Sequence, residues 1–421
     1  MKSITWRCLA AALMLQLGLG WEAFSAANSN ARSLAMGGAY LTLARGMEAP
    51  AWNPANLGLR NSPGFSLTLG SIGFQVENNG YSIADYNRYN GAFLTEDDKN
   101  EILERISSDG LQLAVRGGVQ VLSLSAGRLA LFVPFETATN LRFSEQFLEL
   151  AFHGNPLDQT YDFSNNDGEA YAATGAGMAY GFPIRIGFFN ELAAGVSVRY
   201  VYGIAHGEVL ESSGLVSTTM EGVSGDGRVL LRHSQGGQGF AADWGAVARL
   251  NQRLTAGISL SNMFNSLKWN KKVTMREYGV TLEPVTVESL QNTDEDSIFD
   301  SYESEYDGEA YSAGVPAELR LGASYKLRRI VLAANLVQGF EERLGVSTKT
   351  QLSTGVELRL IGFLPLRAGV SFGGLSGFAF GTGLGLDFGG FDLDFGYGSS
   401  GSLPGEGMKG MAFGMGMSIG I

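Results

Sequence analysis

Residues 411–421, with the sequence MAFGMGMSIGI, decide the fold. Large apolar side chains stand at every second position, and alanine, serine or glycine stands between them. Successive side chains of a β-strand point to opposite faces. The stretch therefore predicts a strand with one apolar face and one nearly bare face.

The same alternation recurs upstream, in segments of about ten residues or fewer. These are residues 192–202, 254–260, 319–327, 352–360, 366–372, 378–388 and 391–397. A soluble sheet would carry few glycines on its water-facing side, because glycine weakens a strand. A transmembrane barrel explains the pattern, since large apolar residues face lipid and small or polar residues face the lumen. About ten residues also match the length of a tilted strand that crosses a bilayer.

The composition agrees with this interpretation. The chain of 421 residues contains 59 glycines, only 17 % charged residues and a formal net charge of -12. A disordered chain would carry denser charge, and a polytopic helical protein would carry apolar runs of about 20 residues. The acidic balance argues against nucleic acid as a partner.

The number of strands follows from further candidate segments. These are residues 65–76, 111–125, 128–135, 141–150, 170–182, 229–233, 240–250, 273–282 and 331–340. Together with the eight segments above they make 17 candidates. Bacterial barrels have even numbers of strands, so some candidates must lie in loops or merge. We expect an all-β fold, an antiparallel transmembrane β-barrel of about 14 strands, with 16 as the alternative.

The N-terminus predicts export. Lys2 and Arg7 precede an apolar core at residues 9–19, and small residues follow it. This is typical of a secretory signal peptide over residues 1–25, with cleavage after Ser25 or Ala27. The single cysteine, Cys8, precedes the core, so the mature chain would form no disulfide. We expect localisation in the outer membrane of a Gram-negative type of cell, in contact with outer-membrane lipid.

Two loops between the predicted strands stand out. In the first, residues 78–109, the run Thr95-Glu96-Asp97-Asp98 is typical of a capping box and predicts a short helix outside the wall. The second, residues 288–309, has nine acidic residues and no Lys or Arg. Such a run indicates a solvated external loop. The alternative is a site for a hard cation such as calcium, although Phe299 stands where an EF-hand starting at Asp294 requires glycine.

Catalytic and metal-binding motifs are absent from the sequence. Residues 369–373 match the pattern G-x-S-x-G, but they fall inside a predicted strand, whereas a nucleophile elbow needs a strand-to-helix turn. The three histidines, His153, His206 and His233, lie far apart and show no metal-ligand spacing. We therefore expect no enzyme activity, no cofactor and no metal site.

Charged residues on the small-residue faces form a second candidate set. They admit two interpretations, structural ion pairs in a polar lumen or a lining that selects what passes. The set comprises Arg199, Glu318, Arg320, Glu357, Arg359, Arg367, Asp387, Asp392 and Asp394.

The segment after the signal peptide carries a family resemblance. It reads ARSLAMGGAY at residues 31–40 and APAWNPANL at residues 49–57. It resembles the start of the FadL-like outer-membrane transporter superfamily, including PorV-type relatives, which open with MGGA followed by NPA and leucine. The resemblance implies a barrel of about 14 strands at residues 64–421, with residues 26–63 folded into the lumen as a plug. The candidate ligand or plug residues are Met36, Gly37, Gly38, Ala39, Trp52, Asn53, Pro54 and Ala55.

The resemblance also implies function. In the transporter branch, hydrophobic small molecules bind near the plug and leave laterally through the wall, so we expect passive uptake of such a ligand. The alternative is a PorV-type barrel that assists protein secretion or surface attachment with envelope protein partners. A soluble secreted β-rich binding protein is the second alternative. The chain ends in Ile421, where many such barrels end in an aromatic residue, and its middle matches no part of the family pattern.

Overall fold

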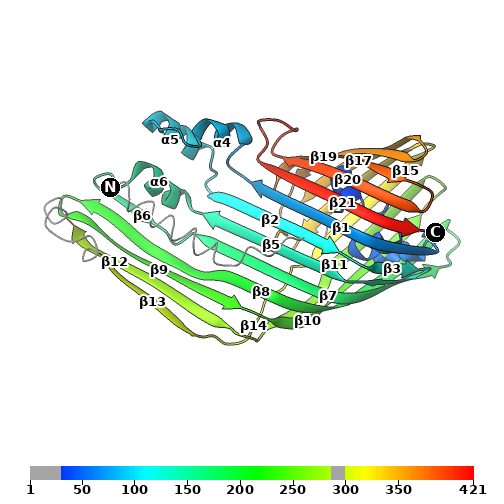
Figure 1. The fold of residues 1–421 in the computed structure, drawn as a ribbon, viewed down its shortest axis with the longest axis horizontal. Coiled ribbons are helices and arrows are strands. Elements are labelled where there is room, and N and C mark those ends of the chain that lie inside the picture. The colour runs from blue at the N-terminus through cyan, green and yellow to red at the C-terminus, as the bar shows by residue number, and fades with distance from the viewer. Residues whose placement is uncertain (1–29, 286–298) are drawn as a thin grey trace.

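The computed structural model describes residues 30–285 and 299–421. The proposed signal peptide and the first part of the acidic loop lie outside these residues. The described chain is mostly antiparallel strand with a few short helices (Figure 1). None of the helices in this part of the chain is long and apolar enough to cross a membrane.

Fourteen wall strands form a closed barrel, as the alternation predicts. Each wall strand pairs antiparallel with its neighbours, and β1 closes the ring by pairing with β21 on one side and β2 on the other. Two of the wall strands are interrupted, so the second consists of β2 and β3 and the third of β4 and β5. The wall strands are β1 (Phe65–Asn78), β2 (Leu111–Gln120), β3 (Ser123–Ala126), β4 (Leu129–Phe132), β5 (Pro134–Phe143), β7 (Asp167–Ile184), β8 (Glu191–Thr219), β10 (Gly237–Arg249), β11 (Leu254–Trp269), β15 (Glu318–Leu327), β16 (Ile330–Gly339), β17 (Gln351–Ile361), β18 (Leu364–Gly373), β19 (Gly377–Asp387), β20 (Phe391–Ser400) and β21 (Gly410–Gly420).

The same sheet extends beyond the barrel at the end with the longer connections (Figure 1). Residues 206–219 of β8 extend past β10 and pair with β9. Strand β9 pairs in turn with β12, and β12 pairs with β13. Two short strands complete it, β6, which pairs with the end of β8, and β14, which pairs with the end of β11. The bounds are β6 (Gln159–Asp162), β9 (Gly222–Ser234), β12 (Thr274–Val285), β13 (Phe299–Asp307) and β14 (Tyr311–Ser312).

This sheet corrects one sequence expectation. The acidic stretch at residues 288–309 was expected to be a loop, but β13 occupies its second half. In β13, Glu305 pairs with Arg276 of β12 at 2.8 Å, so cross-strand charge pairing stabilises an acidic segment as a strand.

Three helices lie in the longer loops. Helices α4 (Ile83–Tyr89) and α5 (Glu96–Glu104) both begin with capping boxes, and the one at Thr95 and Asp98 is confirmed. Partial burial alone would raise the pKa of Asp85 in α4. Hydrogen bonds from Ser82 and the nearby Arg105 outweigh burial and lower this pKa below its usual value. Helix α6 (Glu145–His153) occupies most of the segment 141–150 that was predicted as a strand. That prediction was wrong because Ser144 caps a helix there and accepts a hydrogen bond from the Phe147 amide.

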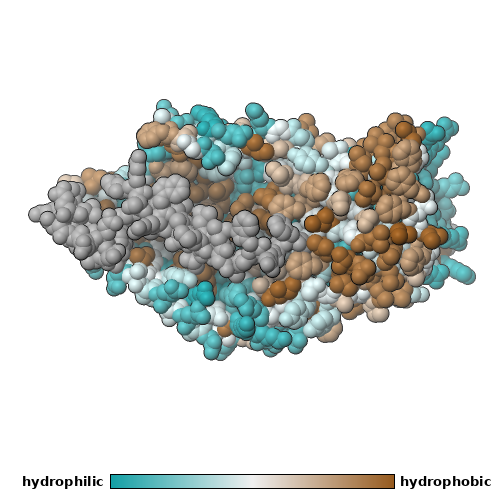
Figure 2. Space-filling model, viewed as in Figure 1, coloured by the Kyte–Doolittle hydropathy of each residue, from teal (hydrophilic) through white to brown (hydrophobic). Residues whose placement is uncertain are grey.

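Side chains on the wall alternate as predicted. Val198 and Phe413, from the large-residue faces, are about half exposed, whereas Ser197 beside Val198 is fully buried. Figure 2 shows apolar side chains gathered in a belt toward the end where the C-terminus lies, bounded by hydrophilic residues at the tip. The connections at this end are short turns, which barrels place on the periplasmic side.

Candidate functional site

Residues 30–62 lie inside the ring of strands. They form α2 (Ala31–Ala35), η1 (Gly46–Glu48), α3 (Ala49–Trp52) and η2 (Pro54–Gly58), seen in blue near the C-terminal end of Figure 1. Helix α2 contacts β18 to β21, η1 contacts β3 and β4, and η2 contacts β7, β8 and β10. Contacts on opposite sides of the ring place this N-terminal segment within the barrel.

Glycines on the inner faces of the wall allow this close approach. A Cβ at Gly195 would lie 2.3 Å from the Ala55 nitrogen, and a Cβ at Gly369 would lie 2.2 Å from the Met36 carbonyl carbon. Any larger side chain at either position would displace the N-terminal segment. Part of the glycine excess therefore makes room for this segment.

Asn53 connects the segment to the wall. Its Nδ2 donates to the backbone oxygens of Ala246 and Ile258 at 3.1 and 3.2 Å, while its Oδ1 accepts from the Ala55 amide at 3.0 Å. Asn53 is fully buried. Buried polar groups stay buried only when they are hydrogen-bonded, and these three bonds satisfy the side chain.

Charged residues link the segment to the opposite wall. Arg32 pairs with Asp394 at 2.6 Å and with Asp392 at 3.1 Å. Asp394 also pairs with Arg367, which pairs with Glu357. The network continues through Arg359, which lies 2.8 Å from Glu357 and 3.3 Å from Asp387. Six of the predicted lumen charges therefore belong to one ion-pair network.

A hairpin between β16 and β17 enters the barrel from the other end. Its tip turns at Leu344 and Gly345, both with positive φ, and the backbone of Arg343 pairs with that of Val346. Leu344 and Val346 are each only 4 % exposed. The Arg343 side chain donates two hydrogen bonds to Glu169 of β7, one of them at 2.9 Å. We call residues 340–350 the inserted hairpin.

Two cavities separate the N-terminal segment from the inserted hairpin. The larger has a volume of about 260 Å³ and is lined by Trp52, Phe132 and Leu344 together with charged groups. The smaller has a volume of about 190 Å³. Trp52 and Gly345 line both, so the cavities meet between the segment and the hairpin. Each is below the roughly 300 Å³ at which ligand pockets begin, so this lumen is nearly closed.

The larger cavity has mixed chemistry. Arg199 pairs with Asp243 at 2.7 Å, and Arg320 pairs with Glu318 at 2.7 Å. Arg320 also lies over the Trp52 ring, 5.2 Å from its centroid. These charges are mutually compensated, and apolar surface from Trp52 and Leu344 remains for a ligand.

The wall is interrupted beside this cavity. The ladder between β2 and β5 ends where Gln120 faces Pro134, and the β3–β4 ladder resumes only at Leu124 and Leu131. Pro134 has no amide hydrogen to donate, and the Val133 amide donates to the Ser123 hydroxyl at 3.4 Å instead of to a strand. Gln120, Phe132 and Pro134 line the cavity. The break therefore borders the lumen.

One buried cluster was missed from the sequence. His206, fully buried, lies 3.0 Å from Glu169 and 2.7 Å from the Tyr311 hydroxyl, with Glu208 nearby. These ligand types suit a metal ion, but Glu169 already pairs with Arg343 and Glu208 with Arg232. The cluster is an ion-pair network that supports the inserted hairpin. No sequence spacing reveals it, because its members come from four strands and a loop.

The predicted N-terminal residues fall into two groups. Gly37, Gly38, Trp52 and Pro54 line the cavities. The other four, Met36, Ala39, Asn53 and Ala55, are buried against neighbouring parts of the barrel or segment. Arg199, Glu318 and Arg320 are the predicted charges that line the larger cavity.

The fold is a closed antiparallel barrel of 14 strands with an N-terminal segment inside it, and solved structures of outer-membrane transporters share this fold. The P. putida toluene transporter TodX is 13 % identical over 94 % of this chain and 99 % of that chain, with a TM-score of 0.51. A TodX deltaS2S3 mutant, described as a monoaromatic hydrocarbon channel, is 12 % identical over 93 % and 98 %, with a TM-score of 0.54. The CymD monoaromatic hydrocarbon channel is 14 % identical over 95 % and 99 %, with a TM-score of 0.51. At such identities the similarity concerns the fold.

The chain belongs to the family described as "Family of unknown function (DUF5723)", whose model matches residues 54–235 and 210–397. No curated protein matches the chain.

Proposed function

We propose that this chain is an outer-membrane barrel for passive uptake of small hydrophobic molecules, with the N-terminal segment acting as a plug. The observation that carries the proposal is the cavity between Trp52 and Leu344, which borders the break in the wall at Pro134. A ligand would enter past the inserted hairpin and leave sideways through the break into the bilayer. The fold shared with proteins described as a toluene transporter and hydrocarbon channels supports this use.

The chemistry of the larger cavity supports a small, largely apolar cargo. Four of its charged side chains form two ion pairs, Arg199–Asp243 and Arg320–Glu318, so a charged ligand that used them would have to break an existing ion pair. An apolar ligand would instead cover Trp52, Phe132 and Leu344 and gain about 25 cal/mol per Å² of apolar surface removed from water.

A cavity-filling substitution tests the proposal. Ala138 lines the cavity and is 5 % exposed, so Ala138→Phe would fill much of the space. We expect uptake of toluene, used as the probe, to fall at least tenfold in cells that express this variant. Ala176→Phe is the matched control, because Ala176 is exposed on the outer face of β7. Equal uptake by wild type and Ala138→Phe, with both barrels folded, would contradict the proposal.

Fractionation tests the membrane placement separately. We expect the protein in the outer-membrane fraction after cell lysis, with the first residues removed. Recovery in the soluble periplasm would favour the soluble binding protein instead.

The second candidate is a secretion or surface-attachment partner. The observation that favours it is the sheet of β8, β9, β12 and β13, which extends beyond the barrel and offers a surface to an envelope protein (Figure 1). Stable co-purification of another envelope protein in mild detergent, lost when this sheet is shortened, would support it. Isolation of the barrel alone would count against it.

A further inference from the structure

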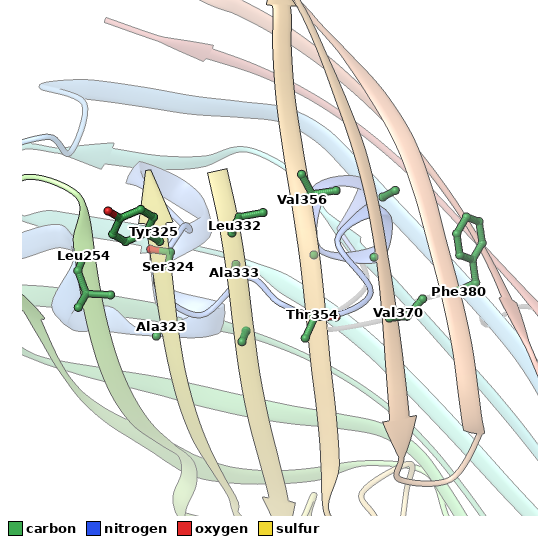
Figure 3. A pocket seen from close by; sticks show the side chains of 14 residues that line it. Leu254, Ala323, Ser324, Tyr325, Leu332, Ala333, Thr354, Val356, Val370 and Phe380 are labelled. Atoms are coloured by element: carbon green, nitrogen blue, oxygen red, sulfur yellow. The ribbon is translucent and has the colours of Figure 1, made fainter. Parts of the chain in front are cut away.

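An apolar groove of about 600 Å³ lies on the outer surface of the wall, across β11 and β15 to β19. Its lining includes Ala323, Ala334 and Ala368 between larger residues such as Tyr325 and Leu332. In Figure 3 the labelled side chains Ala323, Tyr325 and Leu332 stand on strands in front of the N-terminal segment, on the face turned away from it. The groove is therefore separate from the lumen cavities.

The alternation of side chains confirms the outward direction. Asn335 donates to the Gly38 oxygen inside the barrel, so its neighbour Ala334 points outward. Gly355 and Gly369 contact Met36 inside, so Thr354 and Ala368 also point outward.

Strand register explains the groove. Ala323 faces Ala334, and Ala334 faces Thr354, so small residues stand side by side on three neighbouring strands. Larger residues form the next row toward the short turns, where Tyr325 faces Leu332. The result is a trough in a wall that is otherwise built from Leu, Val and Phe.

Basic side chains gather at the ends of the same strands. Arg328 and Arg329 form the turn between β15 and β16. Lys326 and Arg253 stand beside this turn, but in the inward row of side chains that continues through Val331 to Glu357. All four side chains are exposed. Within the described residues, no carboxylate lies at ion-pair distance from any of the four, in a chain whose net charge is -12.

The groove and the basic side chains are close enough for one ligand. Tyr325 and Leu332 lie three residues from Arg328 and Arg329, or about 10 Å along a strand. Long basic side chains extend along apolar surface to place their charge at the membrane interface. An apolar trough that ends at two cations without an ion-pair partner in the described part of the chain, Arg328 and Arg329, matches a molecule with a hydrocarbon chain and an anionic headgroup.

We propose that this face binds a phospholipid of the periplasmic leaflet, with its phosphate at Arg328 and Arg329 and an acyl chain in the groove. The membrane placement rests on the proposed function. The short turns put the basic side chains at the periplasmic surface, where phospholipid phosphates lie. A bilayer offers no water to fill the trough, so an acyl chain is the occupant that the surroundings supply.

Lipid binding to the purified barrel tests this inference. Native mass spectrometry in detergent would count phosphatidylglycerol molecules retained by wild type, R328Q/R329Q and Ala334→Leu, which fills the groove. We expect wild type to retain one lipid more tightly than any others. R328Q/R329Q should weaken this binding roughly twenty-five-fold, because each basic side chain near an anionic lipid contributes about a factor of five. Ala334→Leu should weaken it with all basic side chains in place.

Matched controls lie on the other side of the barrel. Arg185→Gln changes an exposed basic residue in the β7–β8 turn, and Ala176→Leu enlarges an exposed outward alanine. Both should bind lipid like wild type. Equal retention by all five proteins would overturn the proposal, as would displacement of the lipid by inorganic phosphate alone, which would indicate a phosphate site. If Ala334→Leu fails to fold, the R328Q/R329Q result decides alone.

This experiment separates the two proposals. R328Q/R329Q should take up toluene like wild type, since neither arginine lines the lumen cavities. A barrel that fractionates with membranes but shows no selective lipid retention would contradict only the lipid site.

Discussion

Asn53 shows what a sequence reveals about a single residue and what it does not. The pair Asn53-Pro54 predicts a turn capped by the asparagine, and its Oδ1 does accept from the Ala55 amide. Its Nδ2, however, donates to carbonyls 193 and 205 residues away. The sequence of side chains does not show which backbone carbonyls of distant strands will accept these hydrogen bonds. The same limit hid the His206 cluster, whose members carry no regular spacing.

The buried bonds of Asn53 lead to a stability prediction. Asn53→Ala removes the donor from two carbonyls and should lower the free energy of unfolding by about 1–3 kcal/mol, the cost of leaving buried polar groups unsatisfied. Urea unfolding of the detergent-solubilised barrel, followed by tryptophan fluorescence, would measure it. Asn61→Ala is the control, since Asn61 is exposed and makes a single side-chain contact with Arg45. Equal midpoints for the two variants would show that the Asn53 bonds do not hold the segment.

At the scale of elements, alternation predicts well that a segment forms a strand, but it predicts poorly where that strand lies in the fold. Residues 229–233 and 273–282 were predicted as strands and do form strands, yet they belong to β9 and β12 in the sheet beyond the barrel. A period of two reports two unlike faces and does not say whether lipid covers one of them. The inserted hairpin carries no periodic pattern, so nothing in the sequence predicts that it folds inward.

The inserted hairpin leads to a gating prediction. Arg343→Gln replaces a charged pair with Glu169 by a weaker polar contact, and hydrogen bonds to charged groups contribute about 1.5–3 kcal/mol. If that energy holds the hairpin inward, its open population should rise roughly tenfold to a hundredfold. Planar-bilayer recordings should then show more frequent or longer openings. Arg276→Gln, which breaks an exposed pair in the outer sheet, should leave the current at the wild-type level. Indistinguishable traces for all three proteins would mean that the pair does not control the lumen.

At the scale of the whole molecule, the count of 14 strands could be predicted because the chain repeats one simple pattern. Of the 17 candidate segments, α6, β9 and β12 account for the three that do not form wall strands. Ile421 exchanges backbone hydrogen bonds with Phe65, so the ring is completed by main-chain groups next to the last residue. The ring therefore needs no contribution from the N-terminal segment to its strand pairing.

That independence yields a prediction about the whole barrel. Deleting residues 31–60 should leave a barrel that still assembles, because every wall strand keeps both neighbours and Asp394 keeps its pair with Arg367. Without the segment, the lumen should admit small polar solutes, which liposome swelling in a small sugar such as arabinose would detect. Trp52→Ala is the companion variant, because it keeps the segment and removes only the indole side chain that lines both cavities. This variant should admit toluene faster than wild type but should still exclude sugar. A folded deletion variant that still excludes arabinose would assign closure of the lumen to the inserted hairpin alone.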